Sequence, residues 1–586
     1  MRRLAFLVAP ALLLWLGATL TVAQNDEEQP PVDPRFGIIE AFWQPEDAAE
    51  LNVGWDRILF YWNEIQPTGP DDWNTLHVLE EWLVDAQAHD RMVVGLLKNT
   101  PVWATDGEPF SGVPRGLYLP VDDPDNLWAG YVRRVVEYYA PRGVHHWIVW
   151  NEPEIERGVY GHEFSGTTRD YYQLLKVAYQ VARENDPQAI IHLAGWSYWH
   201  DPQWLNKFLT VATADPDGRA NNYFFDVITL HIYFRVETVE TLVEETWAIQ
   251  QRYGLRKPIW INETNASPNL DPLWPVTRPN FQVDLDEQAW YLVQAHALGF
   301  GAKSARIGVY KLYDFLLPPG GESFGIIRPD GSRRPAFYAY KTLVRYLSGF
   351  TYPVERQQSP YFYAFTFHRP AGVTRILWAR TADDVTLQVP ALANEALLVS
   401  ATGEEQETLR ARSGYYRLRL SGAHCEPACD IGGPPIFLIE TAAGARSSNA
   451  VATIDPTRAV VATATATITP TVTSTPNATT TILALTASPT PSRTPTATRT
   501  VTPTPTASPT ITPTPTATST ATAPMVVVAL PTTAAAAPAA PSADASLANG
   551  TTGHDSGGVP IASWIFLGAG VVLGSFLVLA LYRRRP

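Results

Sequence analysis

Short, almost continuously apolar runs alternate with amphipathic stretches between Phe36 and Leu347. Runs of about four to eight apolar residues are typical of parallel strands that are buried on both faces of a sheet. The strands predicted in this way are Phe36–Phe42, Trp55–Tyr61, Met92–Lys98, His145–Asn151, Ile190–Gly195, Asp226–Tyr233, Pro258–Glu263 and Ser304–Tyr310.

Between these runs, apolar residues recur every three or four positions, as they do on one face of a helix. The predicted helices are Trp73–Asp90, Asn126–Tyr139, Thr168–Asn185, Val239–Tyr253, Glu287–Phe300 and Pro335–Leu347. Eight strands that alternate with helical stretches predict an α/β fold, a (β/α)8 TIM barrel over residues 34–347. A doubly wound sheet is the alternative, but the Gly-rich first turn that is usual in that fold is missing after Phe42.

After Leu347 the helical periodicity ends, and short strand-like runs with turn residues between them follow. This pattern predicts a small all-β sandwich module over residues 350–440. Its predicted strands are Tyr361–His368, Arg375–Arg380, Val385–Val389, Ala396–Ala401, Tyr415–Leu420 and Ile436–Glu440. The module could bind carbohydrate or pack against the barrel. The very short connection to the last helix favours packing.

Both ends of the chain carry apolar segments outside this globular part. Two arginines, an apolar run and small residues predict a secretory signal peptide over residues 1–23, with an uncleaved anchor as the alternative. Residues 559–582 hold no charge and are long enough for a transmembrane helix. Three arginines in residues 583–586 place that tail in the cytoplasm. We therefore expect a single-pass protein of the cell membrane whose globular part is extracellular.

Residues 441–558 connect the globular part to this anchor. Residues 456–523 alone hold 27 Thr and 11 Pro, with no aromatic and no acidic residue. Such a composition cannot bury enough apolar surface to offset the entropy lost on ordering, so we predict a disordered Thr/Pro-rich linker. Stalks of this composition often carry O-linked sugar.

Charge and cysteine content exclude two classes of protein. Nine of the 44 basic and three of the 58 acidic residues lie outside residues 24–440, which leaves a net charge of −20 on that part. A nucleic-acid binder needs a basic surface and is excluded. Two cysteines are too few for a disulfide scaffold, but Cys425 and Cys429 are expected to form a local disulfide in an oxidising compartment.

Two glutamates stand where two of the buried strands end. The fourth strand leads into Asn151-Glu152-Pro153, and the seventh ends at Glu263. Because the carboxyl ends of barrel strands carry the reactive groups, both carboxyls should lie in one cup, the hollow at the carboxyl end of the barrel. Two carboxyls that face each other suit double-displacement glycoside hydrolysis. Either glutamate alone could instead cap a helix or pair with an arginine, but the two together favour catalysis.

These motifs resemble the retaining glycoside hydrolases of clan A, with a layout similar to families 39 and 5. The resemblance spans Phe36 to Leu347, and a β module follows the barrel as it does in family 39. It implies that Glu152 is the acid/base and Glu263 the nucleophile. It also implies that Asn151 hydrogen-bonds the sugar 2-hydroxyl.

Three further positions match the same resemblance. Arg57 on the second strand corresponds to an arginine beside the nucleophile, where a cation keeps a carboxylate ionised. His231 and Tyr233 point the same way by strand alternation and resemble residues that line the site, with the tyrosine bonding the nucleophile. A surface ion pair for Arg57 and a core role for His231 are the alternatives.

Aromatic side chains near strand ends are candidates for stacking on sugar rings. They are Trp62, Trp103, Trp196 and Trp199, each of which suits the core equally well. Many clan members place a tryptophan after the eighth strand; here Tyr310 or Tyr313 takes that place. Lys98-Asn99 stands where a histidine is common, and these departures leave the substrate open.

The sequence therefore predicts an extracellular, membrane-anchored glycosidase that cleaves the O-glycosidic bonds of a β-linked glycan with retention of configuration. The acidic body should repel polyanions, which favours neutral glycans such as xylan, mannan or β-glucan. The alternatives are a non-catalytic carbohydrate-binding surface protein and a transglycosylase that uses the same carboxylates. We expect no metal, no cofactor and no obligate protein partner, since the sequence shows no metal cluster or nucleotide-binding loop.

Overall fold

The computed structural model describes residues 30–277, 279–315, 321–425, 428–441 and 460–462. The predicted signal peptide, transmembrane helix and cytoplasmic tail lie outside these residues, and so does most of the predicted linker. In the part of the chain that is described, no helix combines the length and the apolar character needed to cross a membrane.

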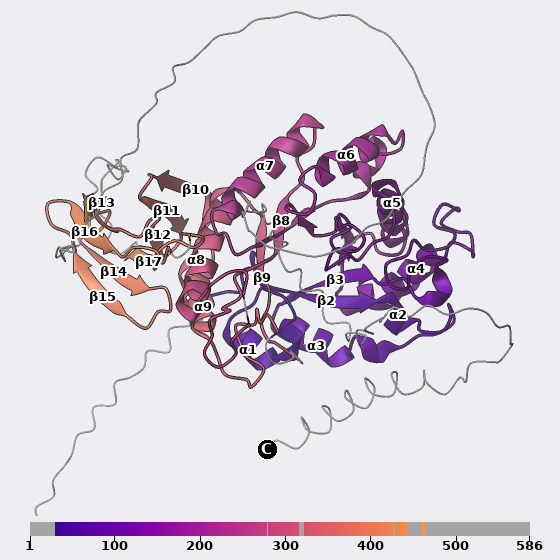
Figure 1. The fold of residues 1–586 in the computed structure, drawn as a ribbon, viewed down its shortest axis with the longest axis horizontal. Helices are drawn as coiled ribbons and strands as arrows, with labels where there is room; N and C mark the ends of the chain where they lie inside the picture. The colour runs from indigo at the N-terminus through magenta and orange to yellow at the C-terminus, as the bar shows by residue number, and fades with distance from the viewer. Residues whose placement is uncertain (1–29, 278, 316–320, 426–427, 442–459, 463–586) are drawn as a thin grey trace, which may run out of the picture. The chain divides into compact units, whose positions relative to one another are not determined.

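A parallel sheet that curls into a barrel forms the first part of the fold (Figure 1). Its strands follow one another in the order β5-β4-β3-β2-β1-β9-β8-β7-β6. Parallel bridges join Asn151 to Gly195 and His192 to Val227, so β5 and β6 act as two halves of one strand that closes the ring. The strands are β1 (Phe36–Ile38), β2 (Trp55–Tyr61), β3 (Met92–Lys98), β4 (His146–Val149), β5 (Ile190–His192), β6 (Trp196–Ser197), β7 (Ile228–Tyr233), β8 (Ile259–Asn265) and β9 (Arg306–Val309).

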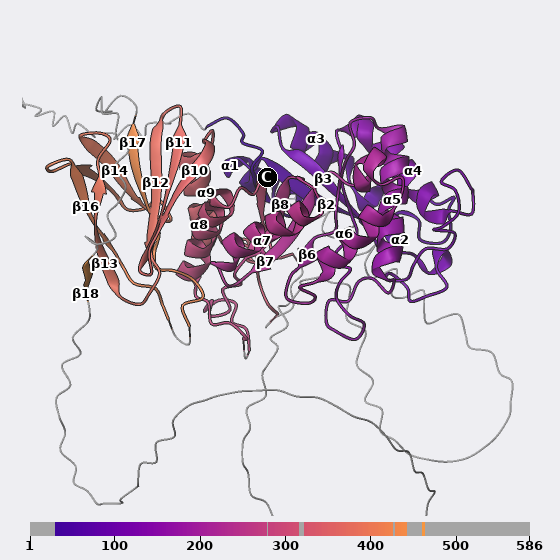
Figure 2. The ribbon, with the colours of Figure 1, turned by 90° about the horizontal axis from the view of Figure 1, so that it is seen from above.

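Helices surround these strands in both views of the ribbon (Figures 1 and 2). They are α1 (Pro45–Glu50), α2 (Trp62–Ile65), α3 (Glu80–Ala88), α4 (Leu127–Tyr139), α5 (Thr168–Asn185), α6 (Trp204–Ala214), α7 (Thr238–Arg252), α8 (Leu285–Gly301) and α9 (Pro335–Leu347). Capping boxes fix the first residues of the two longest of these helices. Thr167 and Asp170 cap α5, and Asp284 and Glu287 cap α8.

Large rings fill the barrel below the strand ends. Trp55 and Trp260 lie with ring centroids 5.4 Å apart, and His192 meets Trp260 edge-on at 4.6 Å. Burial lowers the pKa of His146 to about 3, so this histidine fills space as a neutral ring. At Gly37 a Cβ atom would lie 2.2 Å from the Trp55 ring, so only glycine leaves room for that indole. These rings form a packed layer inside the barrel, below the polar residues at the strand ends.

The second part of the described chain is the all-β module. A six-stranded sheet in the order β10-β11-β12-β17-β14-β15 packs on a three-stranded sheet in the order β16-β13-β18, with apolar residues of both sheets in one core. The strands are β10 (Thr351–Gln358), β11 (Phe362–Arg369), β12 (Gly372–Ala379), β13 (Asp384–Pro390), β14 (Glu395–Ser400), β15 (Gln406–Arg410), β16 (Tyr415–Leu420), β17 (Ile436–Thr441) and β18 (Val460–Ala462), most of them labelled in Figure 2. The predicted barrel and sandwich are both confirmed.

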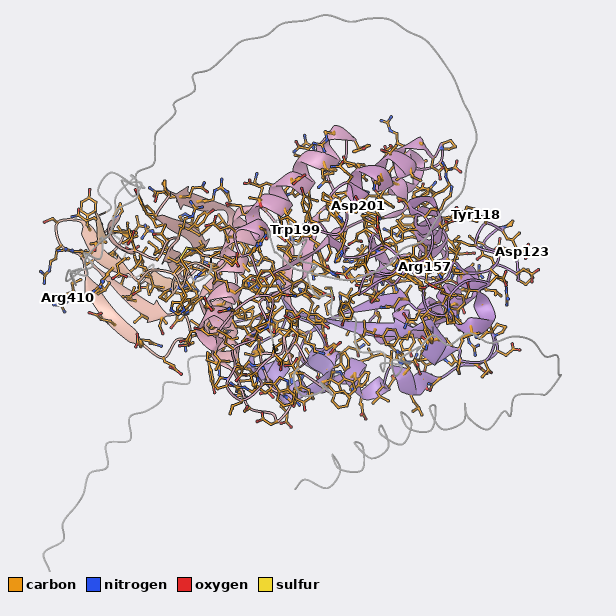
Figure 3. The ribbon with its side chains drawn as sticks, viewed as in Figure 1. Tyr118, Asp123, Arg157, Trp199, Asp201 and Arg410 are labelled. Atoms are coloured by element: carbon orange, nitrogen blue, oxygen red, sulfur yellow. A yellow bond between two sulfur atoms is a disulfide. The ribbon has the colours of Figure 1, made fainter. Side chains whose placement is uncertain are left out.

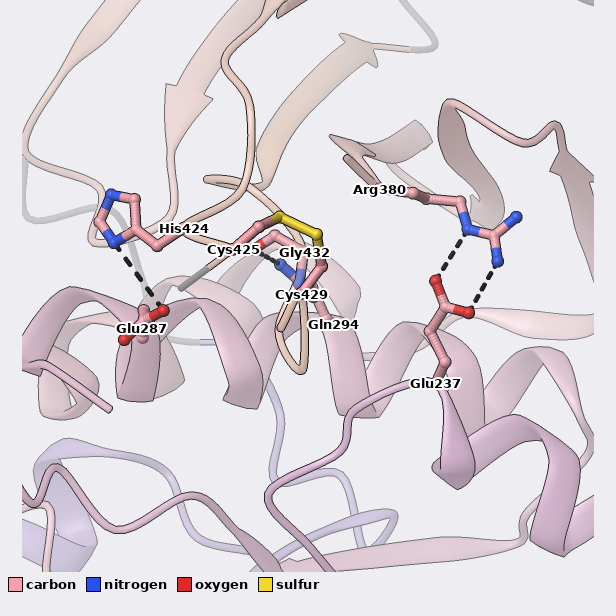
Figure 4. The surroundings of a disulfide bond; sticks show 8 residues. All are labelled: Glu237, Glu287, Gln294, Arg380, His424, Cys425, Cys429 and Gly432. Carbon is pink, nitrogen blue, oxygen red and sulfur yellow. Dashed lines mark hydrogen bonds and ion pairs between the residues drawn. A yellow bond between two sulfur atoms is a disulfide. The ribbon is translucent and has the colours of Figure 1, made fainter. Parts of the chain in front are cut away.

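The module is bonded to the barrel around the predicted disulfide (Figure 4). Cys425 and Cys429 are joined, and the loop that carries them lies along α8. The side-chain amide of Gln294 on α8 accepts from the backbone N–H of Gly432 at 2.9 Å and donates to its carbonyl at 2.9 Å. Nearby, Arg380 forms two hydrogen bonds with Glu237 at the start of α7, at 2.8 and 2.7 Å. These contacts agree with a packing role for the module.

Some element boundaries differ from the sequence predictions. The predicted first strand, Phe36–Phe42, ends at Ile38, because the chain turns at Glu40 into a 3-10 turn over Ala41–Trp43. The predicted helix Trp73–Asp90 begins only at Glu80. The range predicted as linker contains the end of β17 and all of β18, which pairs with β13.

Candidate active site

The two predicted catalytic glutamates lie at the same end of the barrel, on strands that are not adjacent in the ring, and both are buried. Glu263 belongs to β8, and Glu152 follows β4 by three residues. The chain around Glu152 is unusual: Trp150 has φ 70° and Glu152 has φ 40°, a left-handed conformation that is costly for residues other than glycine. Strained backbone of this kind is concentrated at functional sites, where the surrounding structure holds it in place.

His231 of β7 bridges the two carboxylates. Its Nδ1 lies 2.7 Å from Glu152 Oε1 and 3.5 Å from Glu263 Oε2. Those two oxygens are therefore at most about 6.2 Å apart, the sum of the two distances. The structure thus brings Glu152, Glu263 and His231 together, as the sequence predicted.

Glu263 is surrounded by groups that favour its charged form. Arg57 Nη1 lies 2.5 Å from Glu263 Oε1, and the Tyr233 hydroxyl donates to Glu263 Oε2. Burial opposes ionisation of Glu263, but His231, Arg57 and Tyr233 outweigh burial and hold the pKa of this carboxyl below its usual value. Glu263 is therefore ionised at neutral pH, which is the state a nucleophile needs.

Glu152 has a different environment. Its Oε1 accepts from the Ser197 hydroxyl at 2.8 Å as well as facing His231. Glu154 lies beside it, buried, and accepts from the Ser197 backbone N–H at 2.7 Å. Burial, and then the charge of Glu152, raise the pKa of Glu154 well above its usual value. Sequence reasoning missed Ser197 and Glu154; the only signal was that Glu154 directly follows the Asn-Glu-Pro motif.

Asn151 is tied to a buried ion pair at the same rim. Lys98 Nζ, at the end of β3, lies 2.5 Å from Glu163 Oε2, and the Asn151 side chain hydrogen-bonds the same carboxylate. Burial raises the pKa of Glu163, and Lys98 and Asn151 oppose that rise. The Asn151 Oδ1 atom is buried without a partner among the described residues.

The predicted aromatic platforms divide into buried and exposed residues. Trp62 is 0% exposed and stacks on Tyr131 of α4, and Trp196 is 1% exposed, so neither can stack on a sugar in this structure. Trp103 is half-buried and donates to the Gln66 carbonyl at 2.8 Å. Indoles that follow strand ends fill the space between strands and helices, which places these rings in the core.

The remaining aromatic candidates lie nearer the rim. Trp199 is 38% exposed on the loop between β6 and α6 (Figure 3). Tyr310 is buried, with its ring centroid 6.2 Å from that of Tyr233, the residue that bonds Glu263. Tyr313 is half-buried, and its hydroxyl donates to the Pro329 carbonyl at 3.1 Å. Of the predicted platforms, only Trp199 is thus open to stacking on a sugar in this structure, while Tyr310 is as buried as Trp196.

Replacing Tyr233 with phenylalanine should shift the acidic limb of the activity profile to higher pH. The variant loses a hydrogen bond to ionised Glu263, so the pKa of Glu263 rises toward its usual value. Because a lowered pKa stabilises the fold above the unfolded-state pKa, acid unfolding should also begin at a higher pH. Activity and thermal unfolding measured against pH test both statements.

The matched control for this variant is Tyr131→Phe, which removes a buried hydroxyl that donates to the Phe60 carbonyl far from the carboxylates. It should leave the acidic limb of the activity profile in place. An unshifted limb in Tyr233→Phe would show that the tyrosine does not tune Glu263.

Comparison with known proteins shows likeness in fold at low sequence identity. No protein family model matches this chain, and no curated protein matches its sequence. Among solved structures it is similar to a family 39 glycoside hydrolase from the gut symbiont Bacteroides cellulosilyticus WH2, with 15% identity and a TM-score of 0.52, over 70% of this chain and 81% of that one. The resemblance to family 39 that the motifs suggested is thus confirmed at the level of the fold.

Two other solved structures are similar to the chain. One is a monomeric β-xylosidase from Caulobacter crescentus CB15, with 14% identity and a TM-score of 0.48, over 70% of this chain and 96% of that one. The other is a glucosidase from Croceicoccus marinus, with 13% identity and a TM-score of 0.47, over 68% of this chain and 92% of that one.

Proposed function

We propose that the protein is a glycoside hydrolase that cleaves a β-linked glycan by a retaining, double-displacement mechanism. The observation that carries this proposal is the contact of one histidine nitrogen with both buried carboxylates. The limit of about 6.2 Å between Glu152 Oε1 and Glu263 Oε2 supports two carboxyls that act on one glycosidic bond. The lowered pKa of Glu263 beside Arg57 and Tyr233 supports a nucleophile, which a retaining enzyme needs. The fold shared with a family 39 glycoside hydrolase supports the same reaction class.

In the first step ionised Glu263 attacks the anomeric carbon. The bond from that carbon to the glycosidic oxygen breaks, and Glu152 gives its proton to the leaving oxygen. The glycon is then bound to Glu263 as an ester. Arg57 and Tyr233 hold the nucleophile in place and keep it charged until the bond forms.

In the second step Glu152, now a carboxylate, takes a proton from water. The water oxygen bonds to the anomeric carbon, the ester to Glu263 breaks, and both glutamates return to their starting states. Two inversions at the same carbon give a product of retained configuration. His231 and Ser197 fix Glu152 Oε1 throughout, which orients the other carboxyl oxygen of Glu152 for proton transfer.

A panel of aryl β-glycosides tests the proposal with the purified chain, with the product anomer followed by NMR. We expect hydrolysis and a first-formed β product. Glycan binding without hydrolysis of any member of the panel would favour the carbohydrate-binding alternative. Transfer to added sugar in place of hydrolysis would favour the transglycosylase.

We also propose that the enzyme acts outside the cell, exported by residues 1–23 and anchored by residues 559–582. The uncharged apolar segment and the three arginines that follow it support this placement. Hydrolysis of the best aryl glycoside should be found in the membrane fraction of cells that express the full chain. Deletion of residues 559–586 should release the active enzyme into the medium. Soluble activity from the intact, unproteolysed chain would contradict the proposed anchor.

A further inference from the structure

Two buried lysine–glutamate pairs stand at the barrel rim beside the catalytic residues. In the first pair, Lys98 at the end of β3 contacts Glu163 from the loop between β4 and α5, with 2.5 Å between Nζ and Oε2. In the second pair, Lys311 after β9 contacts Glu40 after β1, with 3.0 Å between Nζ and Oε2. All four side chains are largely shielded from solvent.

Both pairs belong to the same cup as the carboxylates. The strand order β3-β2-β1-β9 places them on either side of Tyr61, the last residue of β2. Burial raises the pKa of Tyr61 well above its usual value, and the charges of Glu163 and Glu40 add to that rise, so both pairs lie close to this ring. The first pair reaches the catalytic acid through Asn151, which hydrogen-bonds Glu163.

The chemistry of such a pair matches sugar hydroxyls. An ammonium group has three donors and a carboxylate about four acceptor positions, so one mutual contact leaves several of each. A hydroxyl both donates and accepts, and two adjacent hydroxyls can bridge the two members of a pair. Burying charged groups is costly unless they are paired, which makes two such pairs at one rim unexpected for stability alone.

We propose that these two lysine–glutamate pairs select an uncharged glycon by binding its hydroxyls and excluding sugars that carry a carboxylate. This inference rests on the proposed glycosidase function and names the class of sugar that occupies the site. Three cations, Arg57, Lys98 and Lys311, line the cup, and each already faces a carboxylate. A uronic acid would bring a further negative charge next to Glu40 or Glu163.

The test measures kcat/KM for two aryl glycosides in Glu40→Gln. One is the neutral glycoside that the wild type cleaves fastest, and the other is the uronide with the same ring configuration. Glutamine keeps the shape of the side chain but leaves the Lys311 charge unpaired. The ratio of uronide to neutral activity should therefore be well below one in the wild type and rise about tenfold or more in the variant.

Glu163→Gln is the second variant and should change the ratio in the same direction through Lys98. Lys311→Met should lower the activity toward both glycosides without raising the ratio, because it removes the cation itself. Glu440→Gln is the matched control: it breaks the buried pair of Glu440 with Arg375 in the β module, away from the cup. It should leave the ratio unchanged even if it lowers the thermal stability.

The outcomes separate this inference from the function on which it rests. If no glycoside is cleaved by the wild type, the proposed function fails. If the wild type cleaves the neutral glycoside but both glutamine variants keep the wild-type ratio, the pairs do not discriminate against the carboxylate of the sugar. The inference then fails. A wild type that prefers the uronide would also overturn it.

Discussion

Glu263→Ala should lower kcat by at least about 10⁴-fold for every aryl glycoside, whatever its leaving group, because the group that attacks the anomeric carbon is gone. No glycosyl-enzyme can then form. Azide fits the vacated space and attacks the anomeric carbon directly, so added azide should give a glycosyl azide of inverted configuration. Turnover by HPLC and product configuration by NMR provide the measurement.

Glu152→Ala should fail in a different way. Dinitrophenyl glycosides need little protonation of the leaving oxygen, so they should still form the ester with Glu263. The ester should then accumulate, because no general base activates water. Azide needs no base and should restore turnover, with a product of retained configuration. Azide products with the opposite pattern would reverse the roles assigned to the two glutamates.

The second large effect is expected at Gly195, between β5 and β6. A Cβ atom there would lie 1.9 Å from His231 Nε2, and His231 is buried between the two carboxylates. Gly195→Ala should therefore displace the imidazole from Glu152. A displacement of about 1 Å at a reacting group costs roughly 10²-fold in rate, so kcat should fall by about that factor. Steady-state kinetics together with thermal unfolding measure the change.

Overpacking also destabilises a fold by about 1–3 kcal/mol, so this variant needs a matched control. At Gly95 of β3 a Cβ atom would lie 2.4 Å from the Trp147 ring, a similar clash next to Phe60 and away from the carboxylates. Gly95→Ala should lose comparable stability and keep kcat near the wild-type value. Equal losses of kcat in the two variants would mean that the Gly195 effect is only destabilisation.

The periodicity of the chain predicted most of the barrel because its strands are buried on both faces. β2 and β3 were predicted to the residue, and α5 and α9 likewise. The predicted helices do not include α6, although its buried residues Trp204, Leu205, Phe208, Leu209 and Ala212 share one face.

The edge strands of the module could not be found in this way. β10 and β15 are exposed along most of their length, so neither shows an alternation of apolar and polar residues. Each is a strand because its neighbour, β11 or β14, offers backbone hydrogen bonds along that edge. That pairing depends on residues elsewhere in the chain and leaves no local pattern.

The sequence by itself located the two candidate catalytic carboxylates, because a glutamate at the end of a buried strand is visible as a break in an apolar run. Strand alternation likewise placed His231 and Tyr233 on one face. The clan A resemblance already implied Arg57 beside Glu263. Only the tertiary structure decided the other surroundings: Ser197 on Glu152, Glu154 next to it, and the two lysine–glutamate pairs at the rim. The residues that form these contacts come from different strands and loops. Local periodicity indicates which face of an element is buried, but not which other element packs against it.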